Sequence, residues 1–377
     1  MILPGATLGM LGGGQLGRMF TVAAQTLGYK VIVLDPCANS PAGTIAHQHL
    51  CADYTDQAAL LQLAQSCQAI TTEFENIPAD SLAFLAQHTR VHPSASALTT
   101  TQHRAIEKQF IQQLGIPTAP FIAINSTADC ENIHTQIAFP AILKSATFGY
   151  DGKGQIRCAN QHELLAAFQQ LDQQACILEQ QISLAKEVSV VLARSQSGDI
   201  CHFPVAENHH INGILHSSTV PSSINQHQTE KVFTYADNIA NALDYVGTLA
   251  VEFFISESGD IMVNEIAPRP HNSGHYSLDA CHTSQFEQQV RMLCDLPPGD
   301  STLISPAVMI NLLGDLWPDD QQPDWSCLLS QSNHKLHLYD KAAARPSRKM
   351  GHFTVLADNS EKAMAIANAT FDQLKQS

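Results

Sequence analysis

The chain of 377 residues carries 20 Lys and Arg against 35 Asp and Glu, a formal net charge of −15 near neutral pH. That acidic balance excludes a general affinity for nucleic acids or anionic membranes, because both attract basic proteins. With 44% hydrophobic and 15% charged residues, the sequence is typical of a folded globular protein, and its length predicts two or three domains. No apolar run approaches the roughly 18 residues of a membrane span.

The cysteines and the N-terminus predict a cytoplasmic protein. Ten cysteines are scattered without a CxxC pair, mostly in apolar runs, where a free thiol behaves as a small hydrophobic group. The first basic residue is Arg18, so the N-terminus lacks the positively charged start of a secretory signal.

The first 35 residues predict a β-turn-α-β unit. An apolar strand over residues 6–11 runs into the glycine turn 12–17, followed by a helix over 18–27 and a strand over 30–34 that ends at Asp35. The glycines have the spacing GxGxxG with an acidic residue about 20 positions on, which is typical of dinucleotide binding. Two interpretations stay open: an NAD site, or a doubly wound sheet whose glycines only allow close packing of strand and helix.

Strands and helices continue to alternate, which predicts a parallel sheet with ligands beyond the carboxyl ends of its strands. Glu73, Glu75 and Asn76 lie at the carboxyl end of one such strand. Domain boundaries are expected near residues 100 and 300, the second at a Pro- and Gly-containing stretch. The further elements predicted are helices at 57–66, 79–87, 102–114 and 360–374, and strands at 69–74, 307–312, 335–339 and 352–356.

The segment 139–155 predicts a phosphate-binding loop. An apolar strand delivers Lys144, and three glycines and Lys153 follow it. Glycines expose backbone N–H groups and permit positive φ, so such a loop can fold over a triphosphate while the lysines neutralise it. The Walker spacing GxxxxGK[ST] is absent. The alternative, a solvated hairpin turn, does not require this combination of charges.

A pair of carboxylates is predicted on two strands, 248–255 and 261–266. If Ile255 pairs with Met262, the antiparallel register places Glu252 opposite Glu265. Two like charges facing each other are destabilising unless a cation lies between them, and carboxylates together with a nucleotide suit Mg²⁺. Strict alternation would turn Asn264 to the other face of the sheet.

Two further segments carry cationic side chains. Prolines stiffen the loop 267–275 and aim Arg269 and His271 from a fixed backbone. Four cations lie within residues 341–349; they fit either a solvated turn or a clamp for a phosphate.

Five motifs together resemble those of the 5-(carboxyamino)imidazole ribonucleotide synthases, ATP-grasp ligases of purine biosynthesis. They occur in the family's order over nearly the whole chain: GGGQLGRM from Gly12, TEFENIP from Thr72, GYDGKGQ from Gly149, NEIAPRPH from Asn264 and RKMGH from Arg348.

The resemblance implies an α/β and α+β protein of ATP-grasp architecture. The expected parts are an N-terminal Rossmann-like domain with a parallel sheet (1–100), a two-lobed ATP-grasp domain (101–300) and a small β-rich C-terminal domain (301–377). The two lobes are expected at about 115–180, as a lid, and about 181–300, as the Mg²⁺-binding lobe.

The implied reaction joins bicarbonate to the amine of 5-aminoimidazole ribonucleotide through carboxyphosphate, with ATP converted to ADP and phosphate. The implied cofactors are ATP and Mg²⁺, and the implied assembly is a homodimer. Two alternatives remain. One is formate-dependent glycinamide ribonucleotide transformylase, against which TEFENIP and RKMGH argue. The other is an NAD-dependent oxidoreductase, which leaves the carboxylate pair and the lysine loop unexplained.

The resemblance also assigns roles to residues. The catalytic residues would be Tyr150, Lys153, Arg269 and His271. ATP would be bound by Arg104, Lys144, Gly149, Tyr150, Asp151, Gly152, Lys153, Gly154, Gln155, Glu179, Gln180, Gln181, Ile182, Glu187, His210, Asn264 and Glu265. The ribonucleotide would be bound by Gly14, Gln15, Leu16, Glu73, Asn76, Asn272, Ser273, Lys341, Arg345 and Arg348, and Mg²⁺ by Glu252 and Glu265.

Overall fold

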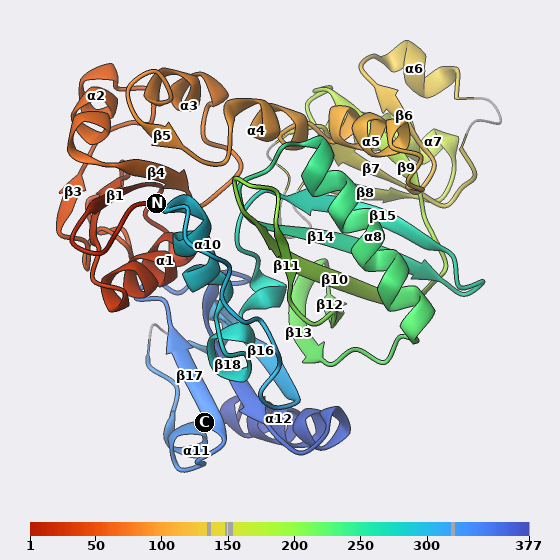
Figure 1. Cartoon of the computed structure of the whole chain (residues 1–377). Coiled ribbons are helices and arrows are strands. Elements are labelled where there is room, and N and C mark those ends of the chain that lie inside the picture. Colours follow the sequence, from red (N-terminus) through yellow and green to blue (C-terminus); the bar gives the residue numbers. More distant parts are fainter. Residues whose placement is uncertain (134–136, 148, 150–153, 318–320, 377) are drawn as a thin grey trace.

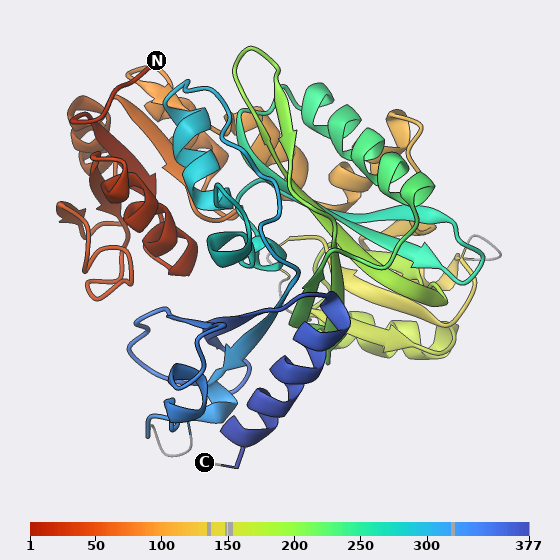
Figure 2. The same cartoon turned by 60° about the horizontal axis from the view of Figure 1, so that its bottom comes forward.

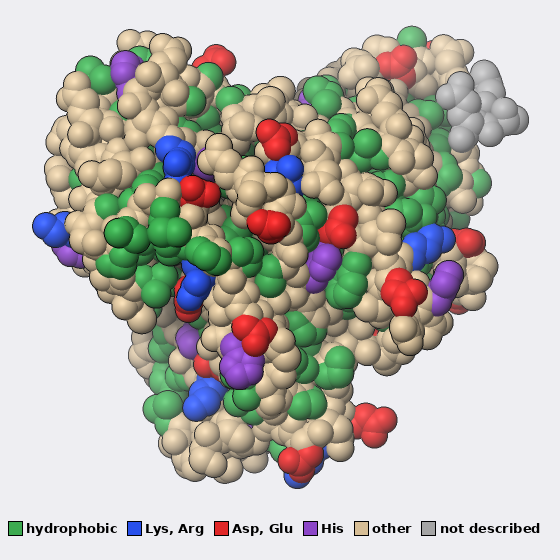
Figure 3. Space-filling model, viewed as in Figure 1, with side chains coloured by type: hydrophobic (Ala, Val, Ile, Leu, Met, Phe, Trp, Pro, Cys, Tyr) green, Lys and Arg blue, Asp and Glu red, His purple; other side chains and the backbone are tan. Residues whose placement is uncertain are grey.

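Three sheets organise the chain (Figures 1 and 2). The structure is a computed structural model that describes residues 1–133, 137–147, 149, 154–317 and 321–376. Within these ranges no helix is both long and apolar enough to cross a membrane. On the face drawn in Figure 3, acidic side chains are scattered among neutral ones over all parts of the molecule.

The N-terminal sheet is parallel, as predicted, with five strands in the order β3-β2-β1-β4-β5. Its central strands are almost wholly buried, because helices cover both faces of such a sheet. The strands are β1 (Thr7–Leu11), β2 (Lys30–Leu34), β3 (Gln48–Leu50), β4 (Ala69–Thr72) and β5 (Arg90–Val91). The helices are α1 (Gln15–Thr26), α2 (Gln57–Ser66), α3 (Ala79–Leu85) and α4 (Ala95–Thr101).

Three predicted boundaries in this region are wrong. Helix α1 begins at Gln15 and not at residue 18, because Gly14 is its extended N-cap. Strand β4 ends at Thr72 and not at residue 74, so Glu73 already lies beyond the strand. Helix α4 was not predicted, and α5 (Arg104–Gln113) begins two residues later than expected.

A four-stranded antiparallel sheet follows, in the order β6-β9-β7-β8. Helix α7 covers it through Leu164 and Phe168, which are buried with Leu143 and Leu178 of the sheet. The elements are β6 (Phe121–Ile124), α6 (Thr127–Glu131), β7 (Ala141–Ser145), β8 (Gln155–Cys158), α7 (Gln161–Gln170) and β9 (Cys176–Gln180).

The largest sheet has nine strands in the order β15-β14-β10-β12-β13-β16-β18-β17, with β11 paired to β10. Its strands are β10 (Leu184–Arg194), β11 (Ile200–His202), β12 (Ala206–Ile211), β13 (Ile214–Val220), β14 (Gly247–Ser256), β15 (Ile261–Ala267), β16 (Ala307–Leu313), β17 (His334–Leu338) and β18 (Lys349–Leu356). Strand β16 pairs directly with β13, so the C-terminal strands continue the central sheet.

Helices pack on both ends of this sheet. They are α8 (Gln226–Ala242), α9 (Ser277–Ala280), α10 (Gln285–Leu293), α11 (Ser326–Leu329) and α12 (Ser360–Leu374). Helix α10 lies between the N-terminal domain and the large sheet (Figure 1), and its Phe286 and Val290 share a core with the N-terminal strands. Strand β18 begins at Lys349, three residues earlier than predicted.

The β14–β15 hairpin confirms that Glu252 lies opposite Glu265, but for a different reason from the predicted one. Ile255 pairs with Ile261 and not with Met262. A register shift next to Glu252 then passes over Asn264, so that Glu252 still meets Glu265. This β-bulge could not be seen in the alternation of the sequence, which assumes a regular ladder.

Candidate functional site

A cavity of about 1060 Å³ lies where the three sheets meet. Its walls come from the glycine turn before α1, from β7, from the β14–β15 hairpin and from the turn before β18. The predicted site residues that line it are Gly14, Gln15, Leu16, Glu73, Asn76, Arg104, Lys144, Gly149, Gln155, Glu187, His210, Glu252, Asn264, Glu265, Arg269, His271, Asn272, Lys341, Arg345 and Arg348.

The other predicted site residues fall into two groups. Tyr150, Asp151, Gly152 and Lys153 lie outside the described residues. Gly154, Glu179, Gln180, Gln181, Ile182 and Ser273 are described but are not among the residues that line the cavity. Ser273 is fully buried and its hydroxyl hydrogen-bonds to Ser189 (2.7 Å).

Behind the cavity wall lies a buried ion cluster around Glu179. Its two carboxylate oxygens meet Lys144 Nζ at 2.8 Å and Lys108 Nζ at 2.7 Å, and all three side chains are almost completely buried. Burial alone would raise the pKa of Glu179, but the two ammonium charges outweigh it and lower that pKa to about 2. Burial lowers the pKa of Lys144, and the charge of Glu179 opposes that change.

We expect Glu179→Gln to lower the free energy of unfolding by about 3–5 kcal/mol, because it leaves two buried lysines without a counter-ion. Urea unfolding measures this loss. The half-exposed pair of Lys186 and Glu207 (2.8 Å) provides the matched control, and Glu207→Gln should cost about 0–1 kcal/mol. Since Glu179 titrates near 4.5 when unfolded and near 2 when folded, the difference should persist above pH 4.5 and fade as the pH falls towards 2.

The carboxylates of Glu252 and Glu265 both face the cavity from neighbouring strands. Burial, and then the charge of Glu265, raise the pKa of Glu252. The Asn264 side chain also faces the cavity and donates a hydrogen bond to Glu252 Oε2 (3.3 Å), so the prediction that it points to the other face is wrong. Two carboxylates in this position fit a divalent cation.

Arg104 joins the carboxylate hairpin to the phosphate-binding loop. Its guanidinium donates to Glu265 Oε2 (3.2 Å) and to the Gly149 carbonyl (3.2 Å). Lys144 reaches the same cavity from β7. These two cations and the glycine at the start of the loop form the basic wall that a triphosphate would need.

The two predicted catalytic residues that the structure describes, Arg269 and His271, have defined partners. The Arg269 guanidinium forms a two-point ion pair with Glu75 of the TEFENIP motif. Burial would raise the pKa of Glu75, but the charge of Arg269 lowers it. Burial, followed by the charge of Arg269, lowers the pKa of His271 well below its usual value, so this imidazole is neutral near pH 7.

His271 is held by a hydrogen bond at one ring nitrogen, and its other ring nitrogen faces Glu252. Nδ1 hydrogen-bonds to Ser273 Oγ (2.8 Å), and Nε2 lies 3.4 Å from Glu252 Oε1. The imidazole therefore has a fixed orientation beside the carboxylate pair, and Ser273 contributes by holding it rather than by lining the cavity.

The glycine turn is already occupied by a carboxylate of the chain itself. Glu73 accepts hydrogen bonds from the backbone N–H groups of Gly14 and Gly17, the second at 2.7 Å. Asp35 accepts from Gly13 N (2.7 Å) and from the Tyr54 hydroxyl (2.7 Å). A dinucleotide would need these same groups for its pyrophosphate and ribose, so the geometry argues against the NAD interpretation.

The four cations of residues 341–349 line the cavity, and Lys341 lies beside the glycine turn. Lys341 Nζ donates to Gln15 Oε1 (2.6 Å), which joins the C-terminal turn to the first helix. Arg348 Nη1 donates to the Ala343 carbonyl (2.8 Å), and Ser347 N to Asp315 Oδ2 (2.7 Å). These contacts tie the turn to α1 and to Asp315, while the side chain of Arg345 is exposed.

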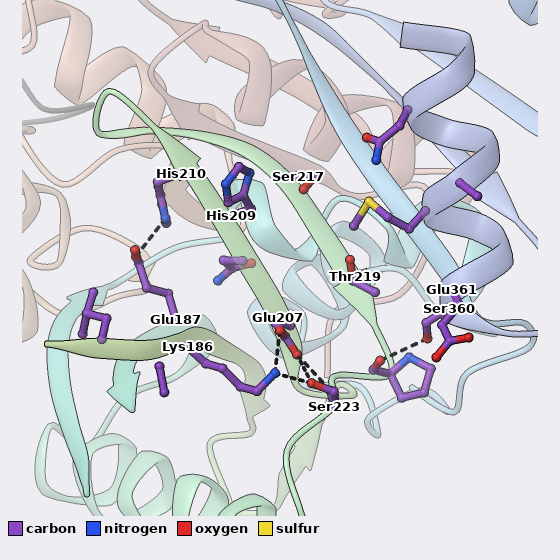
Figure 4. Close-up of a pocket in the computed structure, with 17 residues that line it drawn as sticks. Lys186, Glu187, Glu207, His209, His210, Ser217, Thr219, Ser223, Ser360 and Glu361 are labelled. Carbon is purple, nitrogen blue, oxygen red and sulfur yellow. Dashed lines mark hydrogen bonds and ion pairs between the residues drawn. The ribbon is translucent and has the colours of Figure 1, made fainter. Parts of the chain in front are cut away.

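A second cavity of about 750 Å³ adjoins the first, between β10, β12, β13 and α12 (Figure 4). Glu187 and His210 line both cavities and form an ion pair (2.8 Å). Burial would lower the pKa of His210, but the hydrogen bond to Glu187 raises it. This pair therefore forms part of the wall between the two spaces.

The sequence prediction missed Glu107 and Lys108 as site residues. Both are buried, Glu107 lines the cavity, and they stand three and four positions after Arg104 on α5. That spacing places all three on one face of a helix and was the available signal.

Three family models match successive parts of the chain. They are a ribonucleotide synthetase preATP-grasp domain (residues 5–102), an ATP-grasp domain (109–286) and a phosphoribosylaminoimidazole carboxylase C-terminal domain (307–366). The N5-carboxyaminoimidazole ribonucleotide synthase of Bacillus subtilis is 42% identical over 357 residues, covering 94% of this chain and 93% of that protein.

Solved structures agree over the full length. The ADP complex of an N5-carboxyaminoimidazole ribonucleotide synthetase superposes with a TM-score of 0.92 at 42% identity, covering 100% of this chain and 99% of the other. The Aspergillus clavatus N5-carboxyaminoimidazole synthase in complex with ADP and 5-aminoimidazole ribonucleotide gives a TM-score of 0.92 at 31% identity, covering 99% of each chain.

Proposed function

The chain belongs to the N5-carboxyaminoimidazole ribonucleotide synthase family, and on that premise we propose that it carboxylates 5-aminoimidazole ribonucleotide with bicarbonate and ATP. The products are N5-carboxyaminoimidazole ribonucleotide, ADP and phosphate. One observation carries the proposal: a single cavity is lined by three sets of charged side chains. They are a basic wall for the nucleotide (Arg104 and Lys144), the carboxylate pair of Glu252 and Glu265, and the four cations of residues 341–349, which would form a separate phosphate clamp. The cavity therefore offers cationic side chains to two phosphate-bearing ligands.

The first step joins bicarbonate to the γ-phosphoryl group of ATP. A bicarbonate oxygen attacks the γ-phosphorus, the bond to the β-phosphate oxygen breaks, and ADP leaves with that electron pair. Such a transfer needs positioning and charge neutralisation more than covalent help. Arg104 and Lys144 supply the cationic charge for the nucleotide, and Arg104 also donates to the Gly149 carbonyl.

The second step moves the carboxyl group to the substrate amine. The amine nitrogen attacks the carboxyl carbon of carboxyphosphate, the bond from that carbon to the phosphate oxygen breaks, and the nitrogen loses a proton. Arg269, fixed by Glu75, and the neutral His271 stand beside the carboxylate pair, so we assign them to this centre. Lys341, Arg345 and Arg348 would hold the ribonucleotide phosphate, with Gln15 beside Lys341 and Asn76 in the same cavity.

We assign Mg²⁺ to Glu252 and Glu265. Their facing carboxylates and the raised pKa of Glu252, caused by burial and the charge of Glu265, support a cation between them. Among the described residues no cluster of three or more His, Cys, Asp or Glu side chains is arranged to hold a metal. A two-carboxylate site suits Mg²⁺, which takes its other ligands from water and from the nucleotide, and would neutralise charge on the phosphates. The homodimer and the cytoplasmic location stay predictions.

An assay of ADP release tests the proposed reaction. We expect release that requires ATP, bicarbonate and 5-aminoimidazole ribonucleotide together. Formate with glycinamide ribonucleotide is the control pair, and it should give only background release. Release that ignores bicarbonate and the aminoimidazole substrate, or that responds to the control pair instead, would contradict the proposal.

A further inference from the structure

Helix α5 turns one polar face towards the cavity wall. Arg104, Glu107 and Lys108 have the i, i+3, i+4 spacing of one helix face. Glu107 and Lys108 are 2% and 1% exposed, although ionisable side chains are seldom buried without a specific partner. The partners of these three side chains include three consecutive residues of β15.

The contacts of Glu107 and Lys108 are with the backbone of β15 around its bulge. Lys108 Nζ donates to the carbonyl oxygen of Asn264 (3.1 Å), and Glu107 Oε1 accepts from Ile266 N (2.6 Å). Strand β15 is the terminal strand of the large sheet, so these groups point away from β14. Two side chains of α5 therefore do here what a further strand does elsewhere in a sheet.

The bulge decides where the cavity-facing side chains point. Because Asn264 is passed over in the register, Glu265 lies opposite Glu252, and Asn264 itself also faces the cavity. In a regular ladder, neighbouring residues point to opposite faces, and a slip of one residue would turn the side chain away. Holding the backbone on both sides of Glu265 thus holds its carboxylate in place.

We propose that Glu107 and Lys108 are positioning residues that hold the β15 bulge, and that through it they set the affinity of the Glu252–Glu265 pair for a metal–nucleotide complex. The inference rests on the proposed function for the identity of that ligand. Neither residue is assigned a contact with substrate. Glu107 is the cleaner one to test, because Lys108 also pairs with Glu179 (2.7 Å).

The experiment compares Glu107→Leu, which removes the acceptor, with Glu107→Gln, which keeps an oxygen at the same place. Mn²⁺ is titrated in the presence of ADP and followed by electron paramagnetic resonance, and metal-free ADP binding is measured by calorimetry. We expect Glu107→Leu to weaken Mn²⁺ binding about 10-fold or more, the range seen when residues that orient metal ligands are replaced. Glu107→Gln should stay close to wild type, and metal-free ADP affinity should be unchanged in both.

Gln109→Leu is the matched control, since Gln109 is an exposed residue of the same helix and should tolerate the change. Wild-type Mn²⁺ affinity in Glu107→Leu would overturn the proposal. So would an equal loss in Glu107→Gln, or an equal loss of metal-free ADP binding. If Glu107→Leu does not fold, Glu107→Ala carries the same expectation. The readout needs no turnover, so a chain without the proposed carboxylase activity would still give this result.

Discussion

Glu265→Gln should lower kcat by about 10²- to 10³-fold, the loss typical of removing one electrostatic contact to a reacting phosphoryl or acyl group. Glutamine has nearly the same shape but no negative charge. The variant therefore keeps the β14–β15 hairpin and weakens both the cation site and the ion pair of Glu265 with Arg104 (3.2 Å). ADP release at saturating substrates measures the effect.

Glu257→Gln is the control for this substitution, because Glu257 is exposed in the turn of the same hairpin. It should have wild-type kcat. Thermal unfolding should show that both variants fold. Near wild-type turnover of Glu265→Gln at ordinary Mg²⁺ concentrations would remove Glu265 from the metal site.

Arg348→Ala should raise the KM for the ribonucleotide about 10- to 100-fold, the equivalent of one or two charge-assisted hydrogen bonds. Arg348 lines the cavity from the turn that Lys341 joins to Gln15, whereas Arg104 and Lys144 line it from α5 and β7. The KM for ATP should therefore change little. Steady-state kinetics with each substrate varied in turn measures the two constants.

Lys335→Ala provides the control, since Lys335 is an exposed cation on β17. It changes the net charge as Arg348→Ala does, so it corrects for a general electrostatic effect. Equal increases in both KM values for Arg348→Ala would contradict the assignment of the clamp to the ribonucleotide.

The regular parts of the fold could be predicted from the sequence. Periodicity and capping residues determine α2 and α12, whose predicted bounds are those of the structure. The parallel N-terminal sheet followed from alternating strands and helices, and each of the five family motifs contributes residues to the cavity lining. These features depend on local sequence, or on motifs in each of which the residues lie within a few positions of one another.

The features that could not be predicted depend on contacts between distant segments. Glu73 closes the glycine turn 56 residues away from Gly17, and no local pattern in either segment indicates this. The bulge at Asn264 interrupts the alternation of side chains between the two faces of β15, and the sequence of this strand contains no sign of the interruption. Glu107 and Lys108 appear in the sequence as ordinary charges of an amphipathic helix, because their partners lie on β9 and β15, far away in the chain.

The continuous nine-stranded sheet joins two parts of the proposed site. Strand β14 carries Glu252, and β18 begins at Lys349, the last of the four cations of residues 341–349. An unbroken series of paired strands joins β14 to β18 through β10, β12, β13 and β16. The sheet therefore sets the distance between Glu252 and the proposed phosphate clamp of residues 341–349. An aminoimidazole nucleoside lacks the phosphate, so the clamp would not hold it. Its reaction should therefore be limited by poor placement of the amine as well as by weak binding.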